Sequence, residues 1–170
     1  MAEKIFKIFK KEDSLLVKLP NSDFDSRFSF CYKQTIKQIL AKHNCKALIL
    51  DFSNIDMIDK DGLASLIYTL KIACSKGITL LTCCFNDNII EAYDHSGLKS
   101  IIDFAKSIKE AFIMAEGMLE LRQMEDHMSR LMGNIFGYPL EENFGLTEEE
   151  VSKIKSKIFE HRRLSQIKLQ

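Results

Sequence analysis

Neither a net charge nor a long hydrophobic run is present in this sequence. Its 24 lysine and arginine residues balance 24 aspartate and glutamate residues, so the formal net charge is zero. A neutral chain has no global field that attracts nucleic acid or acidic substrates, and we expect neither as a ligand. No apolar stretch approaches the roughly 20 residues that cross a bilayer. The charged opening "MAEKIFKIFKKED" predicts no secretory signal, and we expect a cytoplasmic protein without membrane insertion.

Glycine, proline and paired cysteines are also scarce. Seven glycines, two prolines and 46% hydrophobic residues are typical of a globular chain of 170 residues with a substantial core. The five cysteines include no CxxC pair, which favours buried thiols in a reducing compartment. Cys83 and Cys84 are adjacent in an expected strand. Their side chains should therefore point to opposite faces, which argues against a redox pair.

Motifs of enzymes and metal sites are missing too. The sequence has no glycine-rich phosphate loop, no GxSxG and no HExxH. Its four histidines have no metal-ligand spacing with a cysteine or with one another. The sequence therefore offers no candidate catalytic residue, and we expect no cofactor and no metal ion.

Hydrophobic periodicity predicts an α/β domain over residues 1–113. Two short β-prone runs, at 4–9 and 14–19, indicate a hairpin. The remaining elements alternate, in the order helix 23–43, strand 46–52, helix 60–76, strand 78–83, helix 86–97, strand 100–104 and a helix opened by a Ser107–Glu110 capping box. Alternation of this kind predicts a mostly parallel sheet with right-handed crossovers and flanking helices, to which the hairpin adds an antiparallel pair.

Residues 114–170 predict a helical extension of two helices. The helix that opens at Ser107 continues to about Phe136, and its first stripe should pack on the sheet through Ile108, Phe112, Ala115 and Leu119. A second stripe has the alternating spacings of three and four that are typical of a heptad seam. Its members are Met114, Gly117, Leu121, Met124, Met128, Leu131 and Ile135.

This seam has two interpretations. In the first, the seam contacts the final helix of the same chain. A Thr147–Glu150 capping box opens that helix, and its apolar stripe begins at Val151. In the second, the seam forms a dimer. Two helices alone bury their apolar faces poorly. We therefore expect a helical hairpin that also supports a homodimer.

The stretch "LILDFSNIDMIDKDGLASL", Leu48–Leu66, joins an apolar strand to a helix start. In it Asp59 is the expected N-cap, Gly62 allows close packing, and Lys60 points to solvent. The acids Asp51, Asp56, Asp59 and Asp61 gather at the carboxyl edge of a parallel sheet, where α/β proteins usually bind ligands. An acidic metal cluster is one hypothesis, and loop acids beside a helix cap are the simpler one, which we favour.

The same stretch resembles the signature of the STAS domain, the fold of bacterial anti-sigma-factor antagonists and of the cytoplasmic tails of sulfate transporters. The family pattern is an apolar strand ending in Asp, a loop, and then Asp-Ser-x-Gly opening a helix. Asp51, Asp59, Gly62 and Leu63 match it, as does "HSGLKSIIDF" at 95–104. The resemblance covers about residues 3–113. It implies a STAS-like fold and a bacterial regulatory module that binds a protein partner and is not an enzyme.

The resemblance also implies a docking surface at residues 53–66. Its expected contact residues are Ser53, Asp56, Asp59, Lys60, Asp61, Gly62 and Leu63. In the antagonists the residue after the aspartate is a serine, phosphorylated by the anti-sigma kinase that they bind, whereas this chain has Lys60. We therefore expect no phosphorylation switch at this position.

Two functions remain open at this point. One is an antagonist-like regulator whose partner is an anti-sigma factor or a sensor kinase. The other is an accessory subunit of a lipid or anion transport complex, because some STAS domains serve transporters and the helical extension offers an additional docking surface.

Overall fold

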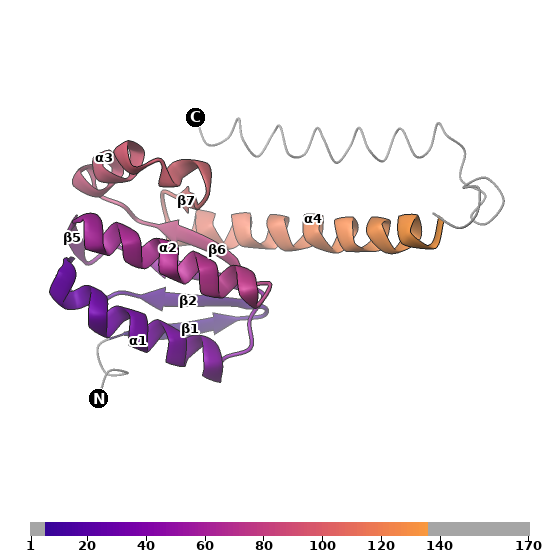
Figure 1. Cartoon of the computed structure of the whole chain (residues 1–170), viewed down its shortest axis with the longest axis horizontal. Coiled ribbons are helices and arrows are strands. Elements are labelled where there is room, and N and C mark those ends of the chain that lie inside the picture. Colours follow the sequence, from indigo (N-terminus) through magenta and orange to yellow (C-terminus); the bar gives the residue numbers. More distant parts are fainter. Residues whose placement is uncertain (1–5, 136–170) are drawn as a thin grey trace. The chain divides into compact units, whose positions relative to one another are not determined.

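The computed structural model describes residues 6–135, and its main feature is a five-stranded sheet (Figure 1). The strands are β1 (Lys7–Lys11), β2 (Ser14–Lys18), β3 (Ser22–Phe24), β4 (Ala47–Asp51), β5 (Ile55–Ile58), β6 (Thr79–Cys83) and β7 (Asp103–Ala105). The helices are α1 (Ser26–Lys42), α2 (Lys60–Ser75), α3 (Asp87–Ser96), the short 3-10 helix η2 (Leu98–Ser100) and α4 (Ile108–Ile135). Within residues 6–135, no helix has both the length and the hydropathy of a bilayer-crossing segment.

The sheet has the order β1-β2-β4-β6-β7, which confirms the predicted α/β architecture. β1 and β2 form the expected antiparallel hairpin, and the other neighbours in this sheet pair in parallel. The register aligns Lys18 of β2 with Asp51 of β4, and Asp51 with Cys83 of β6. The carboxyl ends of three strands therefore meet at one edge of the sheet.

Strand alternation divides the core into one cluster on each face of the sheet. Leu48 and Leu50 of β4 belong to the cluster that also contains buried residues of α1, α2 and α3, whereas Ala47 and Ile49 belong to the cluster that contains residues of α4. All five residues of β4 are buried, as expected for a central strand covered on both faces. The uninterrupted apolar run of β4 thus has a direct structural reason.

Helix α4 begins as the sequence predicts. The Ser107 hydroxyl accepts a hydrogen bond of 3.2 Å from the Glu110 amide, and the Glu110 carboxylate accepts one of 2.8 Å from the Lys106 amide. The helix is continuous to Ile135, but the chain divides into two compact units between Leu119 and Glu120. Its first turns therefore belong to the sheet domain, and the expected final helix lies outside the described residues.

The second, two-stranded sheet is absent from the sequence-based prediction. β3 and β5 pair in parallel, with Ser22 opposite Ile55 and Phe24 opposite Ile58. A strand of three or four residues is too short to show a period of two, so the sequence between the strand at 46–52 and the helix start at Asp59 reads as a loop. The predicted strand at 100–104 is likewise wrong at its start, where η2 precedes β7.

Candidate functional site

The β3–β5 pair places the N-termini of α1 and α2 beside each other, because each strand leads directly into one of these helices. The Asp59 amide donates a hydrogen bond of 3.2 Å to the Phe24 carbonyl, which extends the strand pairing to the helix start. Behind it, Tyr32 of α1 and Thr69 of α2 share a buried hydrogen bond of 2.7 Å. The two helices are thus joined both at their starts and along their length.

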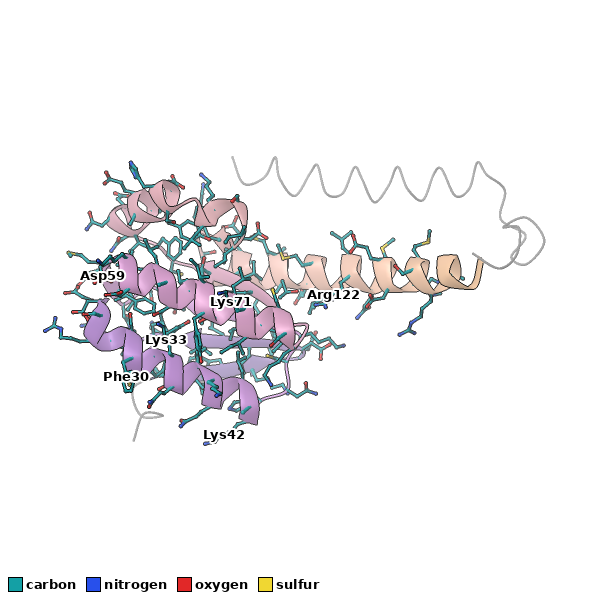
Figure 2. The ribbon with its side chains drawn as sticks, viewed as in Figure 1. Phe30, Lys33, Lys42, Asp59, Lys71 and Arg122 are labelled. Atoms are coloured by element: carbon teal, nitrogen blue, oxygen red, sulfur yellow. The ribbon has the colours of Figure 1, made fainter. Side chains whose placement is uncertain are left out.

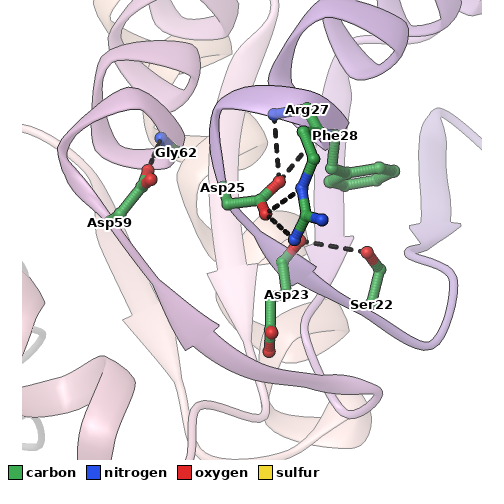
Figure 3. A network of polar contacts seen from close by, with 7 residues as sticks. All are labelled: Ser22, Asp23, Asp25, Arg27, Phe28, Asp59 and Gly62. Atoms are coloured by element: carbon green, nitrogen blue, oxygen red, sulfur yellow. Dashed lines mark hydrogen bonds and ion pairs between the residues drawn. The ribbon is translucent and has the colours of Figure 1, made fainter.

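Each of the two helices is capped by an aspartate (Figure 3). Asp59 accepts hydrogen bonds of 2.9 Å from the amides of Asp61 and Gly62, which confirms it as the N-cap of α2. Asp25 accepts bonds of 3.0 and 3.1 Å from the amides of Arg27 and Phe28. The sequence-based prediction missed Asp25, although an apolar residue followed by Asp precedes both helices and was a usable signal.

Asp25 is also paired with a cation. The Arg27 guanidinium lies 2.6 Å from its second oxygen, and Figure 3 shows the side chain folded back over the carboxylate. This hydrogen bond and the amide bond from Phe28 lower the pKa of the Asp25 carboxyl. Asp25 therefore stays ionised, and the Arg27 guanidinium balances its charge.

Gly62 sets the spacing between the starts of α1 and α2, because it lies against the backbone of Phe24. A Cβ atom at this position would lie 2.3 Å from the Phe24 carbonyl oxygen and 2.7 Å from Cγ1 of Ile58. The first distance involves backbone, which cannot move aside as a flexible side chain does. The predicted role of Gly62 in close packing is thus confirmed.

The predicted docking residues fall into an exposed group and a covered group. Ser53, Asp56, Asp59 and Lys60 are exposed, whereas Asp61 and Leu63 are half-buried and Gly62 is buried. Figure 2 shows Asp59 at the N-terminal end of α2, and Lys60 follows it as the first helical residue. The expectation that Lys60 points to solvent is confirmed.

Met57 is a site residue that the sequence analysis missed. It lies on β5 between Asp56 and Ile58, and 57% of it is exposed. It is an exposed apolar side chain whose neighbour in the chain, Asp56, is an exposed acid. No periodicity singled it out, because β5 itself went unrecognised.

Asn86 fixes β5 from the other side. Its amide nitrogen donates to the carbonyls of Ile55 and Asp56, at 3.1 and 3.0 Å, while its amide oxygen caps α3 by accepting from the Ile89 amide at 2.9 Å. The sequence offers Asn86 or Asp87 as the N-cap of this helix, and the structure has Asn86. Asn86 therefore hydrogen-bonds through both its amide nitrogen and its amide oxygen, and it links β5, which leads into α2, to the start of α3.

Two serines near Lys60 differ in access. Ser53 is exposed in the β4–β5 turn. Ser65 is fully buried, and its hydroxyl donates a bond of 2.8 Å to the Asp61 carbonyl. A kinase can reach the first hydroxyl but not the second.

The four aspartates of this edge do not gather around one point. Asp51 is fully buried, and its side chain lies with those of Cys83 and Cys84, whose potential ligand atoms are all within 4.8 Å of one another. Asp56 and Asp59 are exposed. The structure therefore gives no support to an acidic metal cluster that contains all four residues.

The prediction that Cys83 and Cys84 point to opposite faces is wrong. β6 ends at Cys83, and Cys84 has a positive φ of 63°. This left-handed turn brings its side chain back to the α4 side, where both cysteines pack in the same cluster. Burial raises the pKa of both thiols, so neither is an activated nucleophile.

The seam residues of α4 divide between the two units of the chain. Met114 packs against the sheet cluster, so it serves the first unit. In the second unit Met124 is 47% exposed, and Leu121, Met128 and Leu131 are half-buried. The side chain of Ile135 lies outside the described residues.

Comparison with known proteins identifies the family and the fold of the sheet domain. Residues 6–111 match the STAS domain. A candidate anti-sigma factor antagonist of Thermotoga maritima shares 17% identity at a TM-score of 0.62, covering 68% of this chain and 97% of its own. An anti-sigma factor antagonist from Mycobacterium paratuberculosis shares 15% at 0.56, covering 65% and 92%.

A third similar structure comes from a different class of protein. A sulfate transporter family protein from Wolinella succinogenes shares 18% identity at a TM-score of 0.57, covering 66% of this chain and 92% of its own. Such identities show a common fold for all three proteins. They do not choose between the two classes of function.

Proposed function

Because this chain belongs to the STAS domain family, we propose that it is a non-enzymatic regulatory module that binds a protein partner through β5 and the start of α2. The surface consists of Ser53, Asp56, Met57, Asp59 and Lys60, with Asp61, Gly62 and Leu63 beneath it. We refer to it as the docking surface.

The observation that carries the proposal is the fixed geometry under these exposed side chains. Gly62 sets the approach of α2 to Phe24, and Asp59 closes the first turn of α2. Asn86 holds the backbone of β5. A surface fixed in this way loses little conformational entropy on binding, which favours recognition of a protein.

The composition of the docking surface favours a partner with a basic rim. Asp56 and Asp59 are exposed on the same segment as Met57, and together they outweigh the single positive charge of the exposed Lys60. Met57 supplies an adaptable apolar contact. An anti-sigma factor or a sensor kinase is the partner class that the antagonist-like fold favours.

Control by phosphorylation at the start of α2 is not part of this proposal. Lys60 has no hydroxyl, and its positive charge is opposite to that of a phosphate. Ser53 is the accessible alternative, whereas Ser65 is buried. Mass spectrometry of the protein from its host should find neither serine stoichiometrically phosphorylated, and phosphate on Ser53 would show that the switch has moved.

Site-specific crosslinking tests the docking surface. A photoreactive amino acid replaces Met57 in one variant and Phe9 in a control, because Phe9 is similarly exposed at 53% but lies on the edge strand β1. We expect a specific crosslink to a sigma-regulatory protein from position 57 and none from position 9. Equal crosslinking from both positions would place binding elsewhere.

An accessory role in a transport complex is the second candidate. It is favoured by the sulfate transporter family structure, which matches at a TM-score close to those of the two antagonists. The same crosslinking experiment separates the candidates. Recovery of a membrane transport subunit from position 57 would replace the first proposal by the second.

A further inference from the structure

A row of three side chains crosses the sheet at the carboxyl ends of its central strands. The register places Lys18 of β2, Asp51 of β4 and Cys83 of β6 side by side. Asp51 follows Ile49 by two residues, and Cys83 follows Leu81 by two. Both therefore continue the face of the sheet that α4 covers.

Cys84 joins this row because of its backbone conformation. Its φ of 63° is rare for a residue other than glycine, and its amide donates a bond of 3.2 Å to the Ala105 carbonyl of the neighbouring strand. The turn keeps its side chain on the α4 side instead of the opposite face. Two consecutive thiols and one carboxylate thus converge, with their ligand atoms within 4.8 Å of one another.

Asp51 has an unused oxygen in this group. Its Oδ1 accepts a hydrogen bond of 2.9 Å from the Ser53 amide. Its Oδ2 accepts no well-aligned hydrogen bond from any residue of 6–135, although Asp51 is fully buried and the Cys84 thiol is close enough to interact with the carboxylate. Lys18 Nζ lies 3.9 Å away, which is an ion-pair distance beyond hydrogen-bond reach. A buried carboxylate oxygen without a partner is costly, and a ligand that satisfies it stabilises the fold.

We propose that Asp51, Cys83 and Cys84 bind one thiophilic divalent cation of the zinc class. Zinc bonds thiolate sulfur at about 2.3 Å and carboxylate oxygen at about 2.0–2.2 Å, so its ligand atoms lie roughly 3.3–3.8 Å apart in a tetrahedral site. Small side-chain rotations bring the three groups to that spacing. Oxygen-preferring cations such as magnesium do not suit two sulfur ligands.

Charge and access both fit such an ion. Two thiolates and one carboxylate exceed the charge of a divalent cation by one, and the ammonium group of Lys18 offsets that excess. Cys84 is half-buried, whereas Cys83 and Asp51 are fully buried, so Cys84 provides the entry side. Three protein ligands leave the fourth position to water.

Metal titration of the full-length, reduced chain tests the site. We expect native mass spectrometry to find one zinc ion per chain, and cadmium to produce a thiolate charge-transfer absorption band of the same stoichiometry. Cys83→Ser, Cys84→Ser and Asp51→Asn should each weaken zinc binding by about tenfold or more. Cys74→Ser is the matched control, because Cys74 is an exposed cysteine of α2 outside the group, and it should leave binding unchanged.

A second measurement needs no variant and remains decisive if the substitutions prevent folding. Zinc should protect Cys84 of the unaltered chain from alkylation, while exposed Cys74 stays reactive. X-ray absorption of the zinc-loaded chain should show two sulfur ligands. Unchanged alkylation of Cys84, or a zinc shell of nitrogen and oxygen alone, would each overturn the proposal.

Discussion

Gly62 is the residue whose substitution tests the packing under the docking surface. Gly62→Ala should lower the free energy of unfolding by about 1–3 kcal/mol, because the added methyl overlaps the Phe24 carbonyl oxygen, at 2.3 Å from the Cβ position. Urea unfolding monitored by circular dichroism measures the change.

Gly117 provides the matched control for Gly62. It lies inside α4, and a Cβ at this position meets nothing within 4 Å. Gly117→Ala should therefore raise the free energy of unfolding by about 0.5–1 kcal/mol, the usual preference for alanine in a helix. If both substitutions stabilise the chain, the close approach at Gly62 does not constrain α2.

Asp103 makes stability depend on pH. Partial burial raises the pKa of its carboxyl, because the charged form loses hydration in the folded state. Stability from this group is fully present below its unfolded pKa and is lost as the pH rises through the raised folded pKa. Asp103→Asn should therefore raise the melting temperature at pH 7.

The pH dependence of that gain is its control. At a pH below the ordinary range of aspartate, the carboxyl is protonated in both states, and the advantage of Asp103→Asn should disappear. The melting temperatures of the unaltered chain and of Asp103→Asn are compared from about pH 3 to pH 7. A constant difference over this range would assign the effect to packing and not to charge.

The accuracy of the sequence-based prediction depended on the length of each element. β4 was predictable because its run of buried residues fills both faces of the sheet. β3 and β5, of three and four residues, carry no readable period, yet they hold the two helix starts together. Short pairings of this kind depend on the tertiary structure that surrounds them.

The two candidate sites also differ in how far the sequence predicts them. Asp59 and Gly62 were predictable because an N-cap residue followed by a glycine three positions later indicates a helix start in the local sequence. The grouping of Asp51 with Cys83 and Cys84 was not, because it depends on strand register and on a positive φ at a non-glycine residue. Neither strand register nor a positive φ at a cysteine can be recognised from a single amino-acid sequence.

Helix α4 packs on the sheet through small residues. Ala111 and Ala115 are both 0% exposed, which lets the helix lie close against β4 and β6. Ala115→Leu inserts three carbon atoms into this contact and should lower the free energy of unfolding by about 1–3 kcal/mol.

Ile113 is the comparison on the same helix. It is 59% exposed, so Ile113→Ala should change the free energy of unfolding by no more than about 0.5 kcal/mol. Both values come from denaturant titration. An effect of Ile113→Ala as large as that of Ala115→Leu would contradict the assignment of the buried face.

At the scale of the whole chain, we propose that the second part of α4 and the segment that follows it mediate self-association. A chain truncated after Leu119 retains the α4 residues that pack on the sheet, and it should remain folded and monomeric. The full chain should sediment as a dimer, as the apolar stripe Leu121, Met124, Met128 and Leu131 predicts.

A single substitution refines this experiment without truncation. Met124→Glu places a charge on the most exposed of these side chains and should shift sedimentation of the full chain towards the monomer. Met57→Glu, at a similarly exposed methionine of β5, should leave association unchanged. If the unaltered chain is monomeric at high concentration, the proposed dimer is wrong.

The position of α4 at the end of the domain also governs how the chain folds during synthesis. α1, α2 and α3 emerge from the ribosome before α4, and they cover one face of the sheet. The other face, with Leu16, Ile49 and Leu81, stays open until Ala111 and Ala115 have left the exit tunnel. A nascent chain that stalls before residue 119 therefore presents an apolar sheet face, which is the kind of surface that chaperones bind.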